Sequence, residues 1–272
     1  MVMVSLITLT LIRSTHPSTK LLFLILPSKT YLGPITGSNK KYKVKNFNFF
    51  IRNYFFPPFF FLSLVLIKKK FKNIIFSTNL LQSTVEKITS NKTLKNYLFN
   101  FVYSFFDKNL KNKYKFKQNK NLILFYNKNH DTKKDINLIS FINDISKEHK
   151  VSIVGDKFHN QNLNNLGYVG KKRLELILTK TKFVISSNEN LLSLFNIEAI
   201  NNGAFIIYSR KSFERSMYLK SPFLSLNFKN SSIVSFNNLI KNYKKIKIDK
   251  SFYMNVDKQK YKIELFFNKL YS

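Results

Sequence analysis

The second half of the chain alternates short apolar runs with stretches whose apolar residues recur every three or four positions. The runs predict strands at residues 121–126, 150–154, 166–169, 183–186 and 205–208. The stretches predict helices at residues 135–148, 171–179, 191–203, 233–243 and 256–270. Strands and helices that alternate at these intervals indicate a parallel α/β sheet, and in such sheets ligands bind beyond the carboxyl ends of the strands.

The helix predicted within residues 191–203 contains an unexpected carboxylate. Gly203 lies where a glycine commonly ends a helix. Glu198 lies between Ile197 and Ala199 in a helix that is otherwise apolar. It is therefore either a side chain that reaches solvent beside a lysine, or a ligand-binding group. The apolar residues expected to line the buried side are Leu191, Leu192, Leu194, Phe195, Ala199 and Ile200.

The first half of the chain is less regular. Residues 1–30 contain two apolar runs separated at 13–20, and neither reaches the ~20 residues that a membrane helix needs. The signals of a secretory leader are missing, so we expect buried strands there. Residues 73–77 predict another strand, and the polar composition of residues 87–120 predicts a domain boundary near 112–120.

The most apolar run is at residues 54–67, and Lys68, Lys69 and Lys70 follow it. Its two adjacent prolines and its length argue against a membrane-spanning helix. Two interpretations stay open. The run is a helix packed into the first domain, or it is an apolar segment with a basic flank that lies on an anionic membrane face.

The formal charge of +32 suggests an anionic partner such as nucleic acid, a membrane surface or a phosphorylated substrate. However, the excess is mostly lysine, and it accompanies abundant asparagine, isoleucine and phenylalanine and no tryptophan. That bias is typical of an AT-rich coding sequence, so compositional drift is the alternative explanation. The lysines are scattered and do not form a recognisable RNA-binding motif. The absence of cysteine excludes disulfides, thiolate zinc sites and cysteine nucleophiles.

Several common catalytic patterns are absent from the sequence. There is no nucleophile elbow, no Walker loop, no GxGxxG and no pair of histidines at metal-binding spacing, so no metal is expected. The four histidines are dispersed (His16, His130, His149 and His159). Among them, only His130 follows a predicted strand closely enough to reach a bound ligand.

The order of elements between residues 121 and 209 resembles the donor-nucleotide domain of GT-B glycosyltransferases of the retaining, group 1/family 4 type. The matching pieces are, in chain order, LILFY with a lysine-containing loop, VSIVGD, LGYV, the helix at 171–179, and a strand–turn–helix unit with Glu-Ala ahead of a glycine. The resemblance implies a Rossmann-like sheet that holds a nucleotide sugar at its carboxyl edge.

The resemblance also implies donor-binding residues. Glu198, a pure acceptor, would take hydrogen bonds from the ribose hydroxyls. The turn at Asn190 would hold the diphosphate, because a helix N-terminus presents free N–H groups and partial positive charge. The family has an acidic residue eight positions before this glutamate. That position is Asn190 here, and Glu189 is one residue out of register. Gly155 and Lys134 complete the donor-binding candidates.

The catalytic candidates implied by the resemblance are lysines that follow the first strand. Lys128 stands where the family has an arginine, and Lys133 stands near the family's lysine. Each would stabilise the negative charge of the departing nucleotide diphosphate in the transition state.

A second, shorter resemblance concerns LGPITGS, within a predicted loop at residues 31–39. It is similar to a Gly-Pro stretch of the GT-B acceptor domain, which makes Gly33 and Gly37 acceptor-side candidates. A complete acceptor domain would begin earlier, so the resemblance implies a minimal variant or a truncated reading frame.

The expected fold is therefore α/β and GT-B-like, with a Rossmann-like parallel sheet after an incomplete N-terminal α/β domain. Residues 1–115 would form the partial acceptor-side domain, 119–245 the nucleotide-sugar-binding domain, and 246–272 a helical tail.

The function implied is transfer of a sugar from a nucleotide-sugar co-substrate to a glycan or lipid-linked acceptor in surface polysaccharide assembly, with no cofactor. We expect a cytoplasmic protein with a peripheral contact to the anionic inner face of the cell membrane and no specific nucleic acid. The alternatives are a degenerate, non-catalytic Rossmann-like binding protein and a basic nucleic-acid-binding protein.

Overall fold

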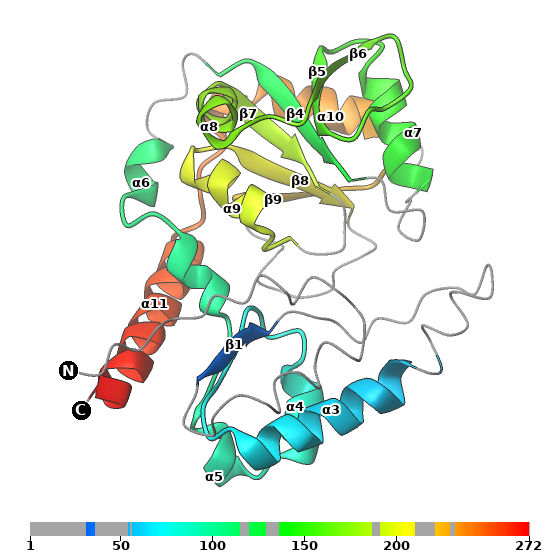
Figure 1. Cartoon of the computed structure of the whole chain (residues 1–272). Helices are drawn as coiled ribbons and strands as arrows, with labels where there is room; N and C mark the ends of the chain where they lie inside the picture. The colour runs from blue at the N-terminus through cyan, green and yellow to red at the C-terminus, as the bar shows by residue number, and fades with distance from the viewer. Residues whose placement is uncertain are drawn as a thin grey trace. The chain divides into compact units, whose positions relative to one another are not determined.

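The chain divides into two compact units. The computed structural model describes residues 31–35, 54, 56–114, 120–128, 136–186, 191–209, 221–228 and 232–271 (Figure 1). The first unit comprises Met1–Ser104 with Gln259–Ser272, and the second comprises Phe105–Lys258. The strands predicted within residues 1–30 lie outside the described residues.

Six parallel strands form the sheet of the second unit, in the order β6-β5-β4-β7-β8-β9. The strands are β4 (Leu122–Asn127), β5 (Val151–Gly155), β6 (Leu163–Gly167), β7 (Thr181–Ile185), β8 (Phe205–Ser209) and β9 (Phe223–Leu226). The chain adds two strands on one side of β4, then crosses to the other side for the last three. That order is the one of the Rossmann fold. The predicted parallel, Rossmann-like sheet is confirmed.

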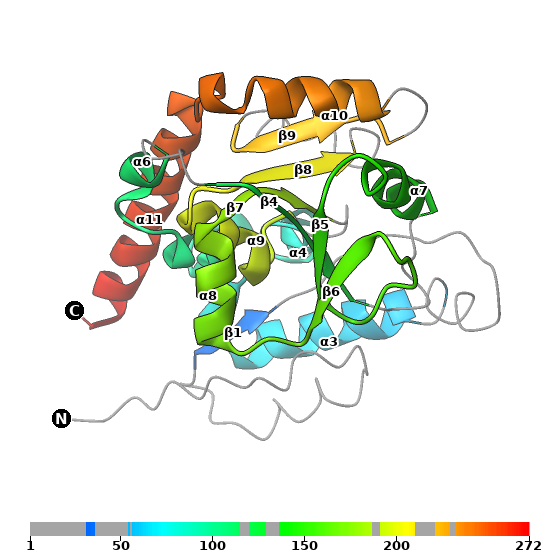
Figure 2. The same ribbon diagram turned by 90° about the horizontal axis from the view of Figure 1, so that it is seen from above.

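Helices cover both faces of this sheet (Figure 2). They are α7 (Ile136–Ile145), α8 (Lys171–Thr179), α9 (Leu194–Asn201) and α10 (Ser232–Lys241). α7 contacts α10, and α8 contacts α9. Connections between parallel strands are right-handed. The chain adds strands in one direction from β4 and in the opposite direction from β7, so the connecting helices of the two halves lie on opposite faces of the sheet.

The central strands are apolar because both of their faces are covered. Every residue of β5 and of β8 is buried, as expected for parallel strands between two helix layers. β6 is an edge strand and begins three residues earlier than predicted, since Asn164 and Asn165 are exposed and interrupt its apolar pattern. β9, the opposite edge, is short and was not predicted.

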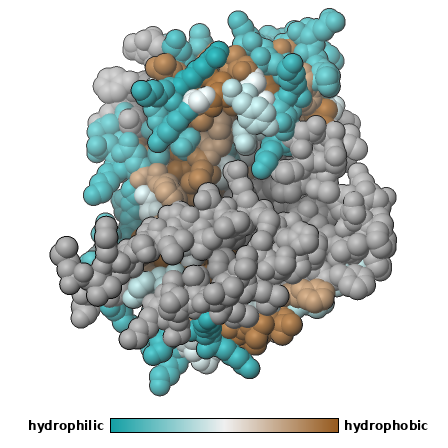
Figure 3. Space-filling view, viewed as in Figure 1, coloured by the Kyte–Doolittle hydropathy of each residue, from teal (hydrophilic) through white to brown (hydrophobic). Residues whose placement is uncertain are grey.

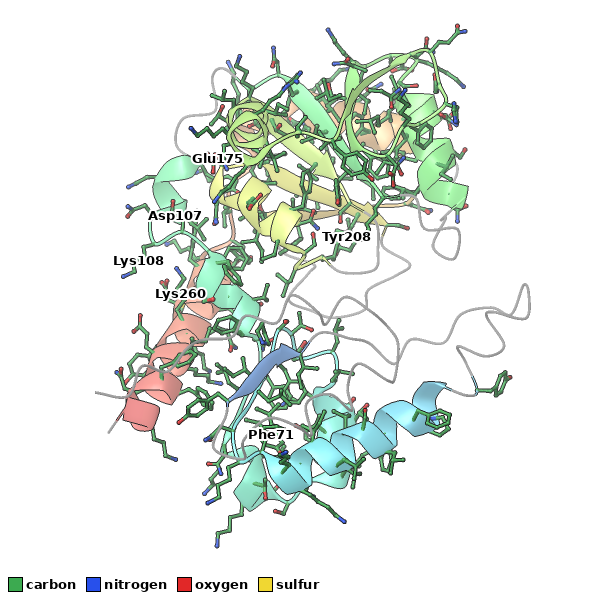
Figure 4. The ribbon with its side chains drawn as sticks, viewed as in Figure 1. Phe71, Asp107, Lys108, Glu175, Tyr208 and Lys260 are labelled. Atoms are coloured by element: carbon green, nitrogen blue, oxygen red, sulfur yellow. The ribbon has the colours of Figure 1, made fainter. Side chains whose placement is uncertain are left out.

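The first unit has a smaller parallel sheet, in the order β1-β2-β3. Its strands are β1 (Leu32–Ile35), β2 (Ile74–Phe76) and β3 (Tyr97–Leu98). Its helices are α3 (Phe56–Lys70), α4 (Gln82–Ile88), α5 (Asn91–Leu94) and the 3₁₀ helix η3 (Phe101–Phe105). Its core includes Leu32, Ile67, Ile74, Phe76 and Phe71, which Figure 4 labels. The predicted α/β character of the N-terminal part is confirmed, since its described strands form a parallel sheet.

The loop predicted at residues 31–39 is wrong for Leu32–Ile35, which form strand β1. Glycine and proline usually mark a turn, but proline is tolerated in an edge strand, and β1 is at the edge of the sheet that the described strands form. Gly33 is needed there because of its backbone φ of +146° and because a Cβ atom would lie 2.4 Å from the carbonyl oxygen of Ile75. Gly33 thus has a packing role, and Gly37 lies outside the described residues.

The remaining elements are α6 (Leu110–Lys113), the 3₁₀ helix η7 (Tyr243–Lys245) and α11 (Lys250–Tyr271). Asn201, at the end of α9, binds the first residues of the second unit. Its amide oxygen accepts a hydrogen bond from Asp107 N (2.8 Å), and its amide nitrogen donates one to Phe105 O (2.7 Å). The buried Tyr114 hydroxyl donates to Ala204 O (2.7 Å). Among the helices within the described ranges, none is long and apolar enough to cross a membrane.

Candidate functional site

The candidate site lies at the carboxyl edge of the six-stranded sheet, where the strand order reverses between β4 and β7. In open α/β sheets this reversal leaves a crevice in which ligands bind. Asn127 ends β4 and Lys128 follows it, and Ser186 follows the neighbouring strand β7. The loops that continue from them, 129–135 and 187–190, lie outside the described residues.

Helix α9 begins at this edge, three residues later than predicted. Ser193 is its N-cap, and the Ser193 hydroxyl accepts a hydrogen bond from Asn196 N. Leu191 and Leu192 are buried in the turn that precedes the helix. The N–H groups of Leu194 and Phe195, in the first turn, have no intrahelical acceptor. They point toward the carboxyl edge with the partial positive charge that favours an anion.

Asn196 fixes the turn between β7 and α9. Its side chain is 2% exposed, and its amide nitrogen donates to the Ser186 hydroxyl (2.8 Å) and to Leu191 O (3.1 Å). One buried side chain thus ties the end of β7 to the residue that follows segment 187–190. Sequence analysis missed it, although an asparagine in the apolar stretch LFNIEAI was a signal.

Glu198 lies on the side of α9 opposite to the sheet. Successive helix residues are about 100° apart, so the buried Asn196, Ile197 and Ile200 face the sheet while Glu198 points away from them. Its side chain is half-buried, not part of the apolar core that its neighbours in the sequence suggested. The predicted buried side of α9 is also wrong for Leu194, which is 56% exposed.

The Glu198 carboxylate is partly exposed. Within the described part of the chain it has neither a hydrogen-bond partner nor an ion-pair partner, despite the many lysines. Phe195 precedes it by three residues, so the two side chains are neighbours one helical turn apart. Because Phe195 packs at the end of β4, this spacing connects Glu198 with the strand reversal.

An aromatic pair joins β4 to α9. The rings of Tyr126 and Phe195 are stacked, with centroids 4.8 Å apart and planes inclined by 21°. Tyr126 is 36% exposed at the carboxyl end of its strand. Offset stacking of this kind adds stability beyond burial and leaves part of the tyrosine ring facing solvent. The pair therefore connects the carboxyl end of β4 to the first turn of α9.

Gly155 brings β5 close to β4. Its backbone φ is +102°, and a Cβ atom would lie 2.2 Å from the carbonyl oxygen of Asn127. Asn127 O accepts from Asp156 N (2.9 Å), and the Asn127 amide donates to Asp156 O (2.9 Å). Gly155 thus permits a closely bonded junction between the two strand ends, directly beside Lys128.

Asp156 and Tyr168 connect the ends of β5 and β6. The Tyr168 hydroxyl donates to the Asp156 carboxylate, and this hydrogen bond raises the pKa of Tyr168. The amide of Asn165 pairs with the backbone of Phe158 in both directions, at 3.0 Å each, which holds the loop after Asp156. These hydrogen bonds restrain the segment between β5 and β6 at the carboxyl edge of the sheet.

Of the predicted site residues, the structure places two side by side: Gly155 and the exposed Lys128 lie at adjoining strand ends. Glu198 lies apart from them in the sequence, on the helix that follows β7. Gly33 belongs to the first unit. The other candidates lie outside the described residues: Lys133, Lys134, Glu189, Asn190 and Gly37. The loop histidine His130 lies outside them too.

Comparison with protein families and with curated proteins gives no match. Among solved structures, the chain is similar to the crystal structure of Anabaena HepE in complex with UDP and glucose, with 12% sequence identity and a TM-score of 0.46. The similarity covers 69% of this chain and 59% of HepE, so this chain spans less than two thirds of that protein.

Proposed function

We propose that the second unit binds a nucleotide sugar at the carboxyl edge between β4 and β7, and that the protein transfers the sugar to a glycan or lipid-linked acceptor. The observation that supports this most is the carboxylate of Glu198, which lacks a partner among the described residues and lies one turn from the start of α9 at the strand reversal. A carboxylate and a helix N-terminus at one site match the two polar parts of a nucleoside diphosphate, its ribose hydroxyls and its phosphates.

Each part of the ligand has a proposed partner. Glu198 accepts hydrogen bonds from the ribose, and the first turn of α9 holds the diphosphate together with Asn190. Glu189, a pure acceptor, takes hydrogen bonds from hydroxyl groups of the donor sugar. Lys128, with Lys133 and Lys134 in the following loop, stabilises the charge of the departing diphosphate. The exposed face of Tyr126 packs against the nucleoside.

In this proposal the small parallel sheet of the first unit is a reduced acceptor domain of the GT-B type, with Gly33 and Gly37 on the acceptor side. The acceptor is a glycan or lipid-linked molecule of surface polysaccharide assembly at the cytoplasmic face of the membrane. The alternative without catalysis follows from Asn190, which stands where the resembling family has an acidic residue. Binding of UDP-glucose without release of free UDP would favour that alternative.

Replacing Glu198 with alanine should remove most of the stabilisation that UDP gives. A ligand that binds only the native state raises the melting temperature by mass action. Hydrogen bonds to a charged acceptor contribute about 1.5–3 kcal/mol, so the Kd should rise about 10- to 150-fold. UDP is the first probe because it carries both the ribose and the diphosphate that the site would hold. Thermal denaturation with and without UDP measures the effect.

Glu175→Ala is the matched control. Glu175 is an exposed carboxylate on α8 of the same unit (Figure 4), so its loss changes the net charge equally but should leave the UDP-dependent shift intact. An equal shift in wild type and Glu198→Ala would mean that the ribose is held elsewhere.

A further inference from the structure

Helix α3 of the first unit is apolar on both of its sides. Its inner side packs into the core through Leu64 and Ile67, which are 4% and 2% exposed, and Phe71 follows directly after its end. A helix that is apolar all round is normally enclosed by protein or lipid. Since α3 packs into the core through one side only, its other side requires explanation.

The outer side of α3 exposes large apolar side chains. Phe59, Phe61 and Leu62 are 53%, 47% and 53% exposed, and Pro58 beside them is exposed too. We call these four residues the α3 outer face. Apolar surface is visible along α3 at the lower edge of Figure 3. Scattered apolar residues on a protein surface are ordinary, but a contiguous group on two turns of one helix marks an interaction site.

The charge around the α3 outer face is entirely positive in the sequence. The helix ends in three lysines, and the chain has no aspartate or glutamate before Glu86. Lys68 has a structural role, since its ammonium donates to Ile88 O. Lys69 and Lys72 are exposed, and within the described residues neither has a hydrogen-bond or ion-pair partner. Lys69 follows Leu62 by seven residues and therefore lies on the same side of the helix.

We propose that α3 is an interfacial membrane helix whose outer face inserts into an anionic bilayer surface while Lys69 and Lys72 bind the lipid headgroups. α3 has 15 residues, which is too short to span a bilayer but suits a helix that lies in the interface. Basic side chains beside an inserted apolar face are attracted to anionic lipids. This inference does not rest on the proposed nucleotide-sugar site, which lies in the other unit.

A second copy of the chain is a poorer occupant of the α3 outer face. Two facing copies would bring their lysines together in molecules that each carry a net charge of +32. Like charges at an interface are repulsive, whereas a bilayer with anionic lipids supplies both an apolar interior and the opposite charge.

The test is sedimentation of the full chain with vesicles of phosphatidylcholine alone or mixed with phosphatidylglycerol, at about 0.15 M salt. Wild type should bind the mixed vesicles. The triple variant Phe59→Ser, Phe61→Ser, Leu62→Ser should bind them at least about tenfold more weakly, because it removes the inserting side chains. Lys69→Gln with Lys72→Gln should weaken binding about 30-fold, or about fivefold for each lysine.

Matched controls separate insertion from general attraction to charge. The triple variant Leu176→Ser, Val234→Ser, Met254→Ser removes apolar side chains that are 66%, 63% and 70% exposed on the second unit. The pair Lys171→Gln, Lys172→Gln removes two exposed lysines of α8. Both controls should bind vesicles nearly as wild type does.

Three results would overturn the proposal: no binding of wild type to anionic vesicles, equal binding of the α3 variants and wild type, or equal losses in the controls. If wild type formed a dimer and did not bind vesicles, and the α3 triple variant were monomeric, the α3 outer face would be assigned to a second copy of the chain. Circular dichroism confirms that each variant is folded. The UDP-dependent melting shift, measured on the same α3 variant, should be unchanged, so the two proposals can fail separately.

Discussion

Gly155→Ala is expected to lower the free energy of unfolding of the second unit by about 3 kcal/mol or more. Two costs combine: an L-residue at a φ of +102° is strained, and the new Cβ would lie 2.2 Å from the carbonyl oxygen of Asn127. That oxygen belongs to the backbone of β4, the neighbouring strand, so it cannot rotate away as a side chain could. Urea unfolding followed by circular dichroism measures the change.

Gly170→Ala is the control for Gly155→Ala. Gly170 is the N-cap of α8, its φ is −68°, and an added Cβ atom would meet open space, with no contact within 4 Å beyond its chain neighbours. Its replacement should cost about 1 kcal/mol or less. Equal losses in the two variants would show that the β4–β5 junction relaxes around a side chain and does not depend on glycine.

Asn196→Ala is expected to destabilise the second unit by about 2–4 kcal/mol and to weaken UDP binding. The substitution removes the donor to the Ser186 hydroxyl and to Leu191 O. The carbonyl oxygen of Leu191, a buried acceptor that loses its donor, costs about 1–3 kcal/mol, and the lost hydrogen bond to the Ser186 hydroxyl adds about 0.5–1.5 kcal/mol. The same loss releases the turn before α9, so the N–H groups of Leu194 and Phe195 would no longer be held in place for the diphosphate. Urea unfolding and the UDP-dependent melting shift measure the two effects.

Asn242→Ala is the matched control for Asn196→Ala. The Asn242 amide donates to Asn238 O at 3.0 Å on the surface, where water replaces the lost bond. Its stability should change by no more than about 0.5 kcal/mol. If Asn196→Ala were as mild, the turn would be held by other contacts.

Elements with a clear period could be predicted from the sequence. α8 has the predicted bounds, and β4, β5 and β8 agree to within one residue, because buried strands and amphipathic helices leave distinct patterns. Where the pattern was broken by local chemistry, the prediction failed. Gly33 and its following proline looked like a loop but belong to an edge strand. Leu191 and Leu192 have helical spacing but fill the turn that Ser193 ends.

The candidate site was partly predictable for the same reason. Glu198 could be identified because a carboxylate stands out in an apolar helix, and Gly155 because a glycine directly follows a predicted strand. The stack of Tyr126 on Phe195 and the hydrogen bond from Asn196 to Ser186 join residues that are apart in the sequence. No local pattern marks these pairs, because the contacts form only when the sheet and α9 pack together.

Calorimetric titration of UDP into the full chain at about 0.15 M salt, with single-stranded DNA titrated in parallel, tests the central claim most directly. A protein of this charge will bind DNA at low salt through counterion release, so only binding that persists at physiological salt is informative. We expect one UDP per chain with a Kd between about 1 µM and 1 mM, and DNA binding that falls steeply as salt is raised. Tight, sequence-dependent DNA binding together with no UDP binding would contradict the proposed function.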